Sequence, residues 1–470
     1  MVPRMTGGKP LPAEVVQQIV AKTDGVPLFV EELTKVVLES DWLRDCTDHY
    51  ELTGSLPAFA IPTTLHDSLM ARLDRLATIK TVAQLGATIG RQFTYELLQV
   101  VSSFDEAMLQ RELGRLVEAE LLYQRGVPPQ ATYTFKHALI QDAAYQSLLK
   151  STRQQYHQRI AQVLEAQFAD TVTTQPELLA QHYTQAGCHE QAMSYWQRAG
   201  RRAYERSAHS EAISHLTKGL ELLQAVPDSS ARAQQEALLQ ATLGAAYTAA
   251  KGYAAPDVER AYTRAQTLCQ QTGDTRQLFP VLVGLWNCYF VRGDLRMARE
   301  LGEQLLTLAE HANDPVWRLR AHAALGEILL HVGQLHPAHA HLEQGIALYA
   351  SQQHRSHAVQ TPTVPCLAYA AWALWLLGYP DQALQRSAEA RTLAEELSHP
   401  LSVAIARHFT ATVHQFRREA QATQEWAAAA TMLSREQGLP FWDGSGSIMW
   451  GWALAAQGWI EEGIAQIRQG

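Results

Sequence analysis

The densest group of possible metal ligands is a histidine cluster in the middle of the sequence, formed by His331, His336, His339 and His341. Metal ligands must converge, and His336 and His339 could do so across one turn of a helix. We expect no acidic or cysteine side chain to complete such a site. The sequence therefore predicts a solvated polar helix face and no bound metal.

The motifs of common enzymes are absent from the sequence. H-E-x-x-H, G-x-S-x-G, G-x-G-x-x-G and the kinase motifs do not occur. The stretch from Gly7 to Lys9 is followed by Pro10 instead of Ser or Thr, and no strand fits before it, so it is not a phosphate loop. His137 has no nucleophile or metal partner nearby in the sequence. We predict that this chain has no catalytic residue.

The composition is that of a globular protein, with 470 residues of which 47% are hydrophobic and 18% charged. A net charge of -8 argues against nucleic acid or an anionic membrane as the main partner. No apolar run reaches the roughly 18 residues that span a bilayer, and the N-terminus is not a signal peptide. A cytoplasmic protein of two to four domains is expected. The scattered cysteines predict reduced thiols in packed helices rather than disulfides or a zinc site: Cys46, Cys188, Cys269, Cys288 and Cys366.

A pair of antiparallel helices is predicted over residues 319–349. Apolar residues recur there at helical spacing, Gly333 ends the first helix, and Pro337 lies near the start of the second. Gly326 and Ala338 are small where the helices would approach closely, and Leu342 would fill the space beside them. Such a pair cannot bury both of its faces alone, so it needs neighbours.

The neighbours are copies of the same pattern. The predicted turn residues are 39 to 45 apart: Gly252, Gly293, Gly333, Gly378, Arg417 and Gly458. Their spacing resembles the tetratricopeptide repeat, but the period exceeds about 34 residues, so longer helices are expected. The regular spacing fails between Gly187 and Gly252, which predicts an extra helix there. The fold class is therefore mainly α, with a tetratricopeptide-like α-solenoid over residues 151–470.

The concave face of the solenoid is the expected binding surface. In such repeats the residues one, four and five places after the small residue of the first helix face the groove. They are Asn287, Phe290, Glu327, Leu330, His331, Trp372, Trp375 and Trp452. Tryptophans in a groove are plausible peptide anchors, although tryptophan is equally suited to the contacts between helices.

The first third of the chain is predicted to hold two further parts. Residues 1–56 comprise a loop over residues 1–10, helices over residues 12–22 and 27–38, and the start of a polar linker over 41–62. Residues 57–150 comprise a helix capped by Thr64, helices over 79–90, 93–101 and 105–118, and β runs over 121–124 and 132–135. Three helices followed by a β-hairpin are typical of a winged helix. Arg111 and Arg115 lie among four glutamates, so DNA contact is not expected.

Two stretches resemble STAND-class ATPases, AAA-related signalling proteins often linked to class III adenylate or guanylate cyclases. TDGVPLFVEELTKVVLES, residues 23–40, resembles the end of their nucleotide-binding module, which implies that residues 1–56 hold the C-terminal lid helices of an ATPase module and a linker. TFKHALIQDAAYQSLL, residues 134–149, resembles the element that joins their winged helix to a helical sensor. The resemblance implies that Gly25 and Pro27 lie near the adenine of a nucleotide, and the alternative is a helix joint that serves geometry alone. ATP and magnesium would be held upstream of Met1, so no cofactor is expected in this chain.

The resemblance implies a non-catalytic sensor or scaffold arm. A protein or ligand would bind in the groove and regulate an attached output domain through an upstream ATPase or cyclase module. One alternative is a portion of an ATP hydrolase or nucleotide cyclase, and another is a STAND-type transcriptional regulator. Both ends of the chain are expected to be truncated, because the nucleotide-binding core is missing and residue 470 falls within a repeat.

Overall fold

The structure is a computed structural model that describes residues 2–23, 26–38, 42–53, 69–70, 73, 77–350 and 357–470. Contacts between residues divide it into two units, Met1–Tyr195 and Trp196–Gly470. The dividing point lies within α12 (His189–Glu205), whereas the predicted domain boundary lies at residue 150, at the start of α9 (Lys150–Gln167). No helix in these ranges is long and apolar enough to cross a membrane.

Unit 1 begins with helices and a β-hairpin: α1 (Val2–Met5), α2 (Ala13–Thr23), α3 (Pro27–Leu38), β1 (Leu43–Asp45) and β2 (Tyr50–Leu52). The hairpin was predicted as linker, and this was wrong because each strand is only three residues long and mostly polar. Its apolar residues, Leu43, Tyr50 and Leu52, pack against the helical core around Ile19 and Leu33. The short helix α1 likewise replaces the first part of the loop predicted over residues 1–10, whereas the residues after Met5 are turn and coil.

The next part of unit 1 combines three helices and three strands. They are α5 (Ala77–Ile89), β3 (Gln92–Thr94), α6 (Tyr95–Val101), α7 (Glu106–Glu118), β4 (Leu122–Arg125) and β5 (Thr132–Phe135). The strands form an antiparallel sheet in the order β3-β5-β4. The predicted helix from Phe93 was wrong at its start, because Phe93 lies in β3, where its ring stacks on Tyr133. The helix predicted after Thr64 falls largely on residues outside the described ranges.

Unit 1 ends with α8 (Ala138–Gln146), α9, α10 (Ala169–Thr174), α11 (Pro176–Ala186) and the start of α12. A buried chain of polar groups joins three of these helices. The Tyr145 hydroxyl lies 2.9 Å from His157 Nε2, and His157 Nδ1 lies 2.8 Å from His182 Nδ1. Burial lowers the pKa of His157 to about 4 and of His182 to about 3, so both are neutral at pH 7.

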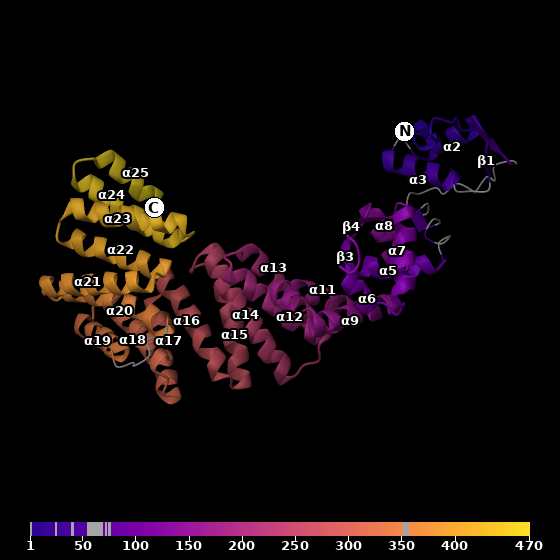
Figure 1. The fold of residues 1–470 in the computed structure, drawn as a ribbon. Helices are drawn as coiled ribbons and strands as arrows, with labels where there is room; N and C mark the ends of the chain where they lie inside the picture. The colour runs from indigo at the N-terminus through magenta and orange to yellow at the C-terminus, as the bar shows by residue number, and fades with distance from the viewer. Residues whose placement is uncertain are drawn as a thin grey trace. The chain divides into compact units, whose positions relative to one another are not determined.

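Unit 2 is a stack of helices in which neighbours along the chain pack side by side (Figure 1). After the end of α12 come α13 (His209–Glu221), a 3₁₀ turn (Leu222–Ala225), α14 (Ser230–Lys251), α15 (Pro256–Thr272), α16 (Thr275–Arg292), α17 (Leu295–Ala312), α18 (Pro315–His331), α19 (Leu335–Ala350), α20 (His357–Leu376), α21 (Pro380–Leu397), α22 (Pro400–Phe416), α23 (Ala420–Glu436), α24 (Pro440–Ala456) and α25 (Ile460–Gln469). The predicted solenoid is confirmed, and α13 is the additional helix. From α14 to α24 the helices are 16 to 22 residues long, which explains the long period.

The predicted turns lie between the two helices of each pair. Gly333, for example, follows α18 with φ 78°, in the left-handed region that ends many helices. The turn between α22 and α23 differs from the prediction in one residue. Arg418 takes the left-handed conformation, with φ 64°, whereas Arg417 is right-handed, with φ -74°. The turn therefore exists where expected, but without a glycine its residue was misplaced by one.

The contact between α18 and α19 depends on a glycine. A Cβ atom added at Gly326 would lie 2.5 Å from Leu342 Cγ and 3.3 Å from the Ala338 carbonyl oxygen. Leu342 and Ala338 are fully buried in the same apolar cluster. The last pair repeats this arrangement, because a Cβ at Gly451 would lie 2.5 Å from the Gly463 carbonyl oxygen. Small residues at the crossing therefore set how closely paired helices approach.

We predict that Gly326→Ala lowers the free energy of unfolding by about 1–3 kcal/mol, because the added methyl overpacks against Leu342. The effect should shrink in a Leu342→Ala background, where the clashing atoms are gone. Gly114→Ala in α7 is the control, since its Cβ would meet nothing within 4 Å and alanine favours helix. Urea unfolding measures all variants. A loss of the same size with and without Leu342 would contradict this account of the contact.

Candidate functional site on the concave face

The first helices of five consecutive pairs enclose a cavity of about 140 Å³ in unit 2. These helices are α16, α18, α20, α22 and α24, and the loop after α14 completes the wall. The lining residues are Tyr253, Asn287, Phe290, Val291, Arg320, Glu327, Pro365, Tyr369, Leu401, Ile405, Phe409, Phe441 and Trp442. The lining is thus mainly apolar and aromatic, with one basic and one acidic side chain.

Helical spacing brings these residues to one face. Tyr369 lies four residues after Pro365, and Phe409 lies four after Ile405, so each helix contributes a stripe that faces the cavity. Tyr253 meets Phe441 edge to face, with ring centroids 5.7 Å apart. The loop after α14 therefore contacts the first turn of α24 at the wall of the cavity.

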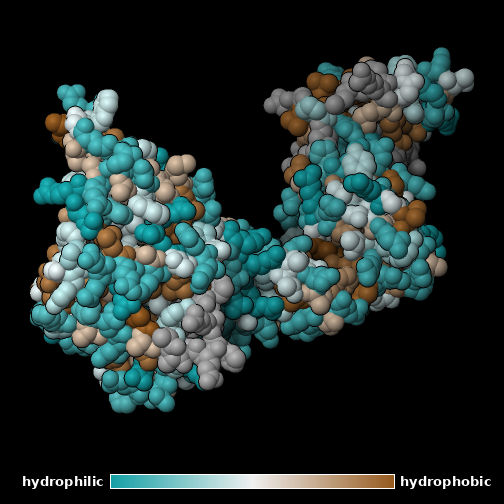
Figure 2. Space-filling view, turned by 60° about the vertical axis from the view of Figure 1, so that its left-hand side comes forward, coloured by the Kyte–Doolittle hydropathy of each residue, from teal (hydrophilic) through white to brown (hydrophobic). Residues whose placement is uncertain are grey.

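Aromatic rings continue from the cavity along the same helices. The His331 ring lies 5.0 Å from Phe290 and 5.5 Å from Trp372. Tyr369 contacts Phe409 at 4.5 Å, between ring centroids. Beyond the cavity lining, Phe416 contacts Trp372 and Trp375 at 5.8 and 6.1 Å. The cavity and this aromatic row form one surface, which we call the inner groove. In Figure 2 the visible surface is mostly hydrophilic, with hydrophobic residues scattered over it.

The structure distributes the predicted groove residues among four environments. Asn287, Phe290 and Glu327 line the cavity, and His331, Trp372 and Trp375 lie in the aromatic row. Leu330 is only 5% exposed and belongs to the apolar core between helices. Trp452 is half-buried on α24 and is not part of the cavity lining.

The predicted nucleotide-proximal residues remain a prediction. Gly25 lies outside the described residues, and Pro27 is the exposed first residue of α3.

Several lining residues were not predicted from the sequence. Arg320 lies seven residues before Glu327, two turns away on the same face of α18. That spacing was the available signal for Arg320. Tyr253, Phe441 and Trp442 gave no such signal, because they come from a loop and from the first turn of α24.

Arg320 holds its positive charge in the cavity with only long contacts. Its guanidinium lies 3.4 Å from Asn287 Oδ1 and 3.8 Å from Glu327 Oε1, and it sits over the Trp286 ring at 5.0 Å. The side chain is 19% exposed. Ideal charged hydrogen bonds are about 2.7–2.9 Å long. The guanidinium therefore retains donors that a carboxylate entering the cavity could use.

Glu327 does not fully neutralise that charge. Burial raises the pKa of Glu327 to about 7, and the nearby Arg320 opposes this shift only in part. A substantial fraction of Glu327 is therefore protonated near neutral pH. The cavity then carries the Arg320 charge with incomplete compensation, which favours an anionic group on a ligand.

The histidine cluster does not converge on one point. His331 Nδ1 lies 2.7 Å from the Glu327 carbonyl oxygen in the inner groove, whereas His341 Nδ1 lies 2.9 Å from Nδ1 of the buried His322. His339 Nε2 lies 3.5 Å from Glu343 Oε1. The expectation that no acidic residue stands at ligand spacing on this helix was therefore wrong, because Glu343 lies one turn after His339. That contact joins only one histidine and one carboxylate.

A network of four charged side chains joins α3 to the sheet region within unit 1. Lys136 Nζ lies 3.1 Å from both Glu31 Oε1 and Glu120 Oε2, and Lys35 Nζ lies 2.9 Å from Glu31 Oε1 and also contacts Glu120. The two lysines lower the pKa of Glu120 to about 2. Opposite charges thus alternate around the network, which we call the charge square.

We predict that Glu327→Gln changes the pH dependence of stability. A buried acid with a raised pKa binds its proton more tightly in the folded than in the unfolded state. Stability is therefore full below the unfolded pKa of about 4.5 and falls as pH rises toward 7. The wild type should lose up to about 3 kcal/mol more than the variant between pH 4.5 and 7.5. Urea unfolding at several pH values checks this, and parallel curves for the two proteins would contradict it.

Comparisons with known proteins give distant likenesses. No protein-family model matches the chain. An uncharacterized protein of Rhizobium meliloti (strain 1021) is 24% identical over 457 residues, which are 95% of this chain and 43% of that protein, so the chain spans less than half of its length.

Among solved structures, the apo form of the quorum sensor NprR from B. thuringiensis is 13% identical with a TM-score of 0.48. The alignment covers 80% of this chain and 95% of that one. A STAND protein with a tetratricopeptide repeat sensor from Pyrococcus horikoshii is 11% identical with a TM-score of 0.41, covering 97% of this chain and 69% of that one.

Proposed function

We propose that this chain is the sensing arm of a STAND-class signalling protein and that its inner groove binds a peptide or an extended segment of a partner protein. The observation that carries the proposal is that the Arg320 guanidinium makes only long polar contacts in a cavity lined by aromatic rings. The resemblance of residues 23–40 and 134–149 to STAND proteins supports the signalling context.

The size of the cavity favours a peptide over a metabolite. Small-molecule pockets usually have about 300–1,000 Å³, whereas this cavity has about 140 Å³. One side chain or one carboxylate fits there, and the rest of the ligand would follow the aromatic row from His331 to Trp375. Large aromatic residues and arginine are the residue types that dominate binding energy at peptide interfaces. The ligand would therefore combine an acidic group or C-terminal carboxylate with apolar side chains.

The charge square offers a route from sensing to output within unit 1. Residues 77–135, within the domain predicted over residues 57–150, have the order of helices and strands found in winged helices, and we take them as the core of that domain. Glu31 and Lys35 belong to α3, the helix that resembles the lid of the ATPase module, while Glu120 and Lys136 flank the sheet. A ligand-dependent movement of the winged-helix domain would strain these ion pairs and release α3. An upstream ATPase or cyclase module would read that change.

The two alternatives to a sensing arm, an enzyme portion and a transcriptional regulator, require different features of the chain. As part of an ATP hydrolase or cyclase, it would need residues outside this sequence for the chemistry. As a transcriptional regulator, it would need a surface for DNA. Arg111 and Arg115 both contact the buried Glu112, at 3.0 and 3.2 Å, so their charges are partly compensated within α7. An upstream Walker loop and cyclase domain would support the first alternative, and an added helix-turn-helix domain the second.

We predict that Arg320→Gln weakens peptide binding. Peptides would be selected from a random heptapeptide library on the full chain, and their affinity measured by calorimetry. Loss of charged hydrogen bonds costs about 1.5–3 kcal/mol, so the Kd should rise roughly 10- to 100-fold. Phe409→Ala should also weaken binding, because Phe409 lines the cavity.

Arg299→Gln is the matched control for this experiment. Arg299 lies on α17, a second helix of its pair, and forms an exposed ion pair with Glu303 at 3.0 Å. Loss of the Arg299 charge should leave the Kd of the selected peptides unchanged. Selected peptides that bind equally well to the Arg320 and Phe409 variants would overturn the proposed site, as would a library that yields no peptide specific for the chain.

A further inference from the structure

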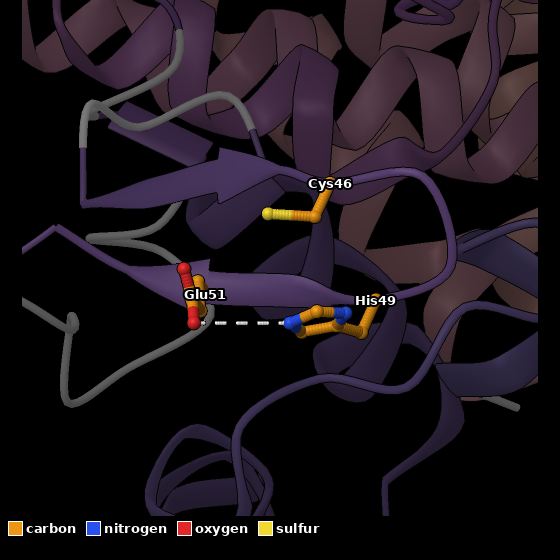
Figure 3. Close-up of side chains that lie close together, drawn as sticks. All are labelled: Cys46, His49 and Glu51. Atoms are coloured by element: carbon orange, nitrogen blue, oxygen red, sulfur yellow. Dashed lines mark ion pairs between the residues drawn. The ribbon is translucent and has the colours of Figure 1, made fainter.

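Three side chains of metal-ligand type meet at the turn of the β1–β2 hairpin. Cys46 follows β1, His49 precedes β2, and Glu51 lies within β2 (Figure 3). Their ligand atoms all lie within 4.8 Å of one another, and His49 Nε2 lies 3.9 Å from Glu51 Oε1. The sequence had suggested that Cys46 lies in a packed helix. That was wrong for Cys46 and for Cys188, which lies between α11 and α12, and right for the three buried cysteines of unit 2.

The hairpin register explains why the three side chains meet. Asp45 pairs with Tyr50 and Arg44 with Glu51, so Cys46 and His49 form the next pair toward the turn. The Cys46 N–H donates to the His49 carbonyl oxygen at 2.9 Å. Because side chains alternate between the faces of a strand, Cys46, His49 and Glu51 share one face. Figure 3 shows the Cys46 sulfur and the His49 ring pointing toward Glu51.

Contacts with the segment before α2 hold the turn in place. Lys9 Nζ donates to Asp45 Oδ1 at 2.5 Å and to the Cys46 carbonyl oxygen at 3.0 Å. The Tyr50 N–H donates to the Pro10 carbonyl oxygen at 3.1 Å. Both edges of the turn are therefore tied to the segment before α2. Such anchoring reduces the ordering that a ligand must impose.

The Asp48 carboxylate fixes the tautomer of the His49 ring. The carboxylate oxygen Oδ1 of Asp48 lies 2.7 Å from His49 Nδ1. A carboxylate accepts the proton of Nδ1, so the lone pair is on Nε2, the nitrogen nearer to Glu51. Metal-binding histidines commonly have this arrangement, in which a carboxylate fixes the tautomer and the ring orientation.

We propose that Cys46, His49 and Glu51 bind one Zn²⁺ ion, with water as the fourth ligand. Thiolate, imidazole and carboxylate are zinc ligands, at bond lengths of about 2.0–2.3 Å, which place neighbouring ligand atoms roughly 3.3–3.8 Å apart. The present separations need to close by about 1 Å. Cys46 and His49 are half-buried and Glu51 is exposed, so the ion reaches the site from solvent. Zinc would link the two strands at the turn and stiffen the hairpin.

The test is a titration of the full, reduced chain with Co²⁺, which reports thiolate ligation by a charge-transfer band in the near ultraviolet. The wild type should bind one equivalent of Co²⁺, and added Zn²⁺ should displace the bound Co²⁺. Cys46→Ser should abolish the band, His49→Gln and Glu51→Gln should weaken Co²⁺ binding at least tenfold, and Asp48→Asn should weaken it roughly 10- to 100-fold. Cys188→Ser, which removes the other half-buried thiol, should leave the titration unchanged.

Circular dichroism would verify that each variant is folded. Absence of a thiolate band in the folded wild type would overturn the proposal. So would a band that survives Cys46→Ser, or one that depends on Cys188. Peptide binding to the inner groove does not enter this test, so the zinc site and the proposed function succeed or fail separately.

Discussion

The close contact between the two helices of each pair is the constraint on which the solenoid depends. At Gly326 the absence of a side chain lets Leu342 pack directly onto the helix backbone, and at Gly451 the facing backbone itself lies that close. Each pair buries only one side of its apolar surface in this way. The remaining surface must stack on the next pair, which makes the repeats continuous and leaves the first helices facing inward. The inner groove is thus a consequence of helix packing.

The same packing explains the electrostatics of the inner groove. Arg320 and Glu327 lie on α18, a helix whose other faces are filled by apolar clusters with α16, α17, α19 and α20. Two charged groups in such surroundings lose much of their contact with water. Glu327 responds by favouring its neutral form, and Arg320, which cannot lose its charge, keeps unused hydrogen-bond donors. Binding of an anionic ligand group would satisfy a charge that the fold leaves incompletely compensated.

The sequence predicted the parts of the fold that depend on repetition and helical period. Gly333 and its counterparts fixed the turns, and the small residue at 326 fixed the helix crossing. The prediction failed where short segments carry little pattern. The β1–β2 hairpin has only Leu43, Tyr50 and Leu52 as apolar residues, and Phe93 lies in a three-residue strand directly before a helix. The candidate site was accessible in part, since a fixed offset from the small residue located Glu327. Arg320 was missed although its seven-residue spacing from Glu327 places it on the same face of α18. Phe441 depends on how helices far apart in the sequence meet, and the pattern of a single helix holds no information on that contact.

The most direct test of the account is hydrogen exchange of the full chain with and without a selected peptide. We predict slower exchange in the first helices α16, α18, α20 and α22, with little change in the second helices α17, α19, α21 and α23. Because ligand binding is proposed to release α3, the exchange of α3 should also change when the peptide binds. Protection concentrated on the second helices, with α18 and α20 unaffected, would contradict the claim that the inner groove is the working surface.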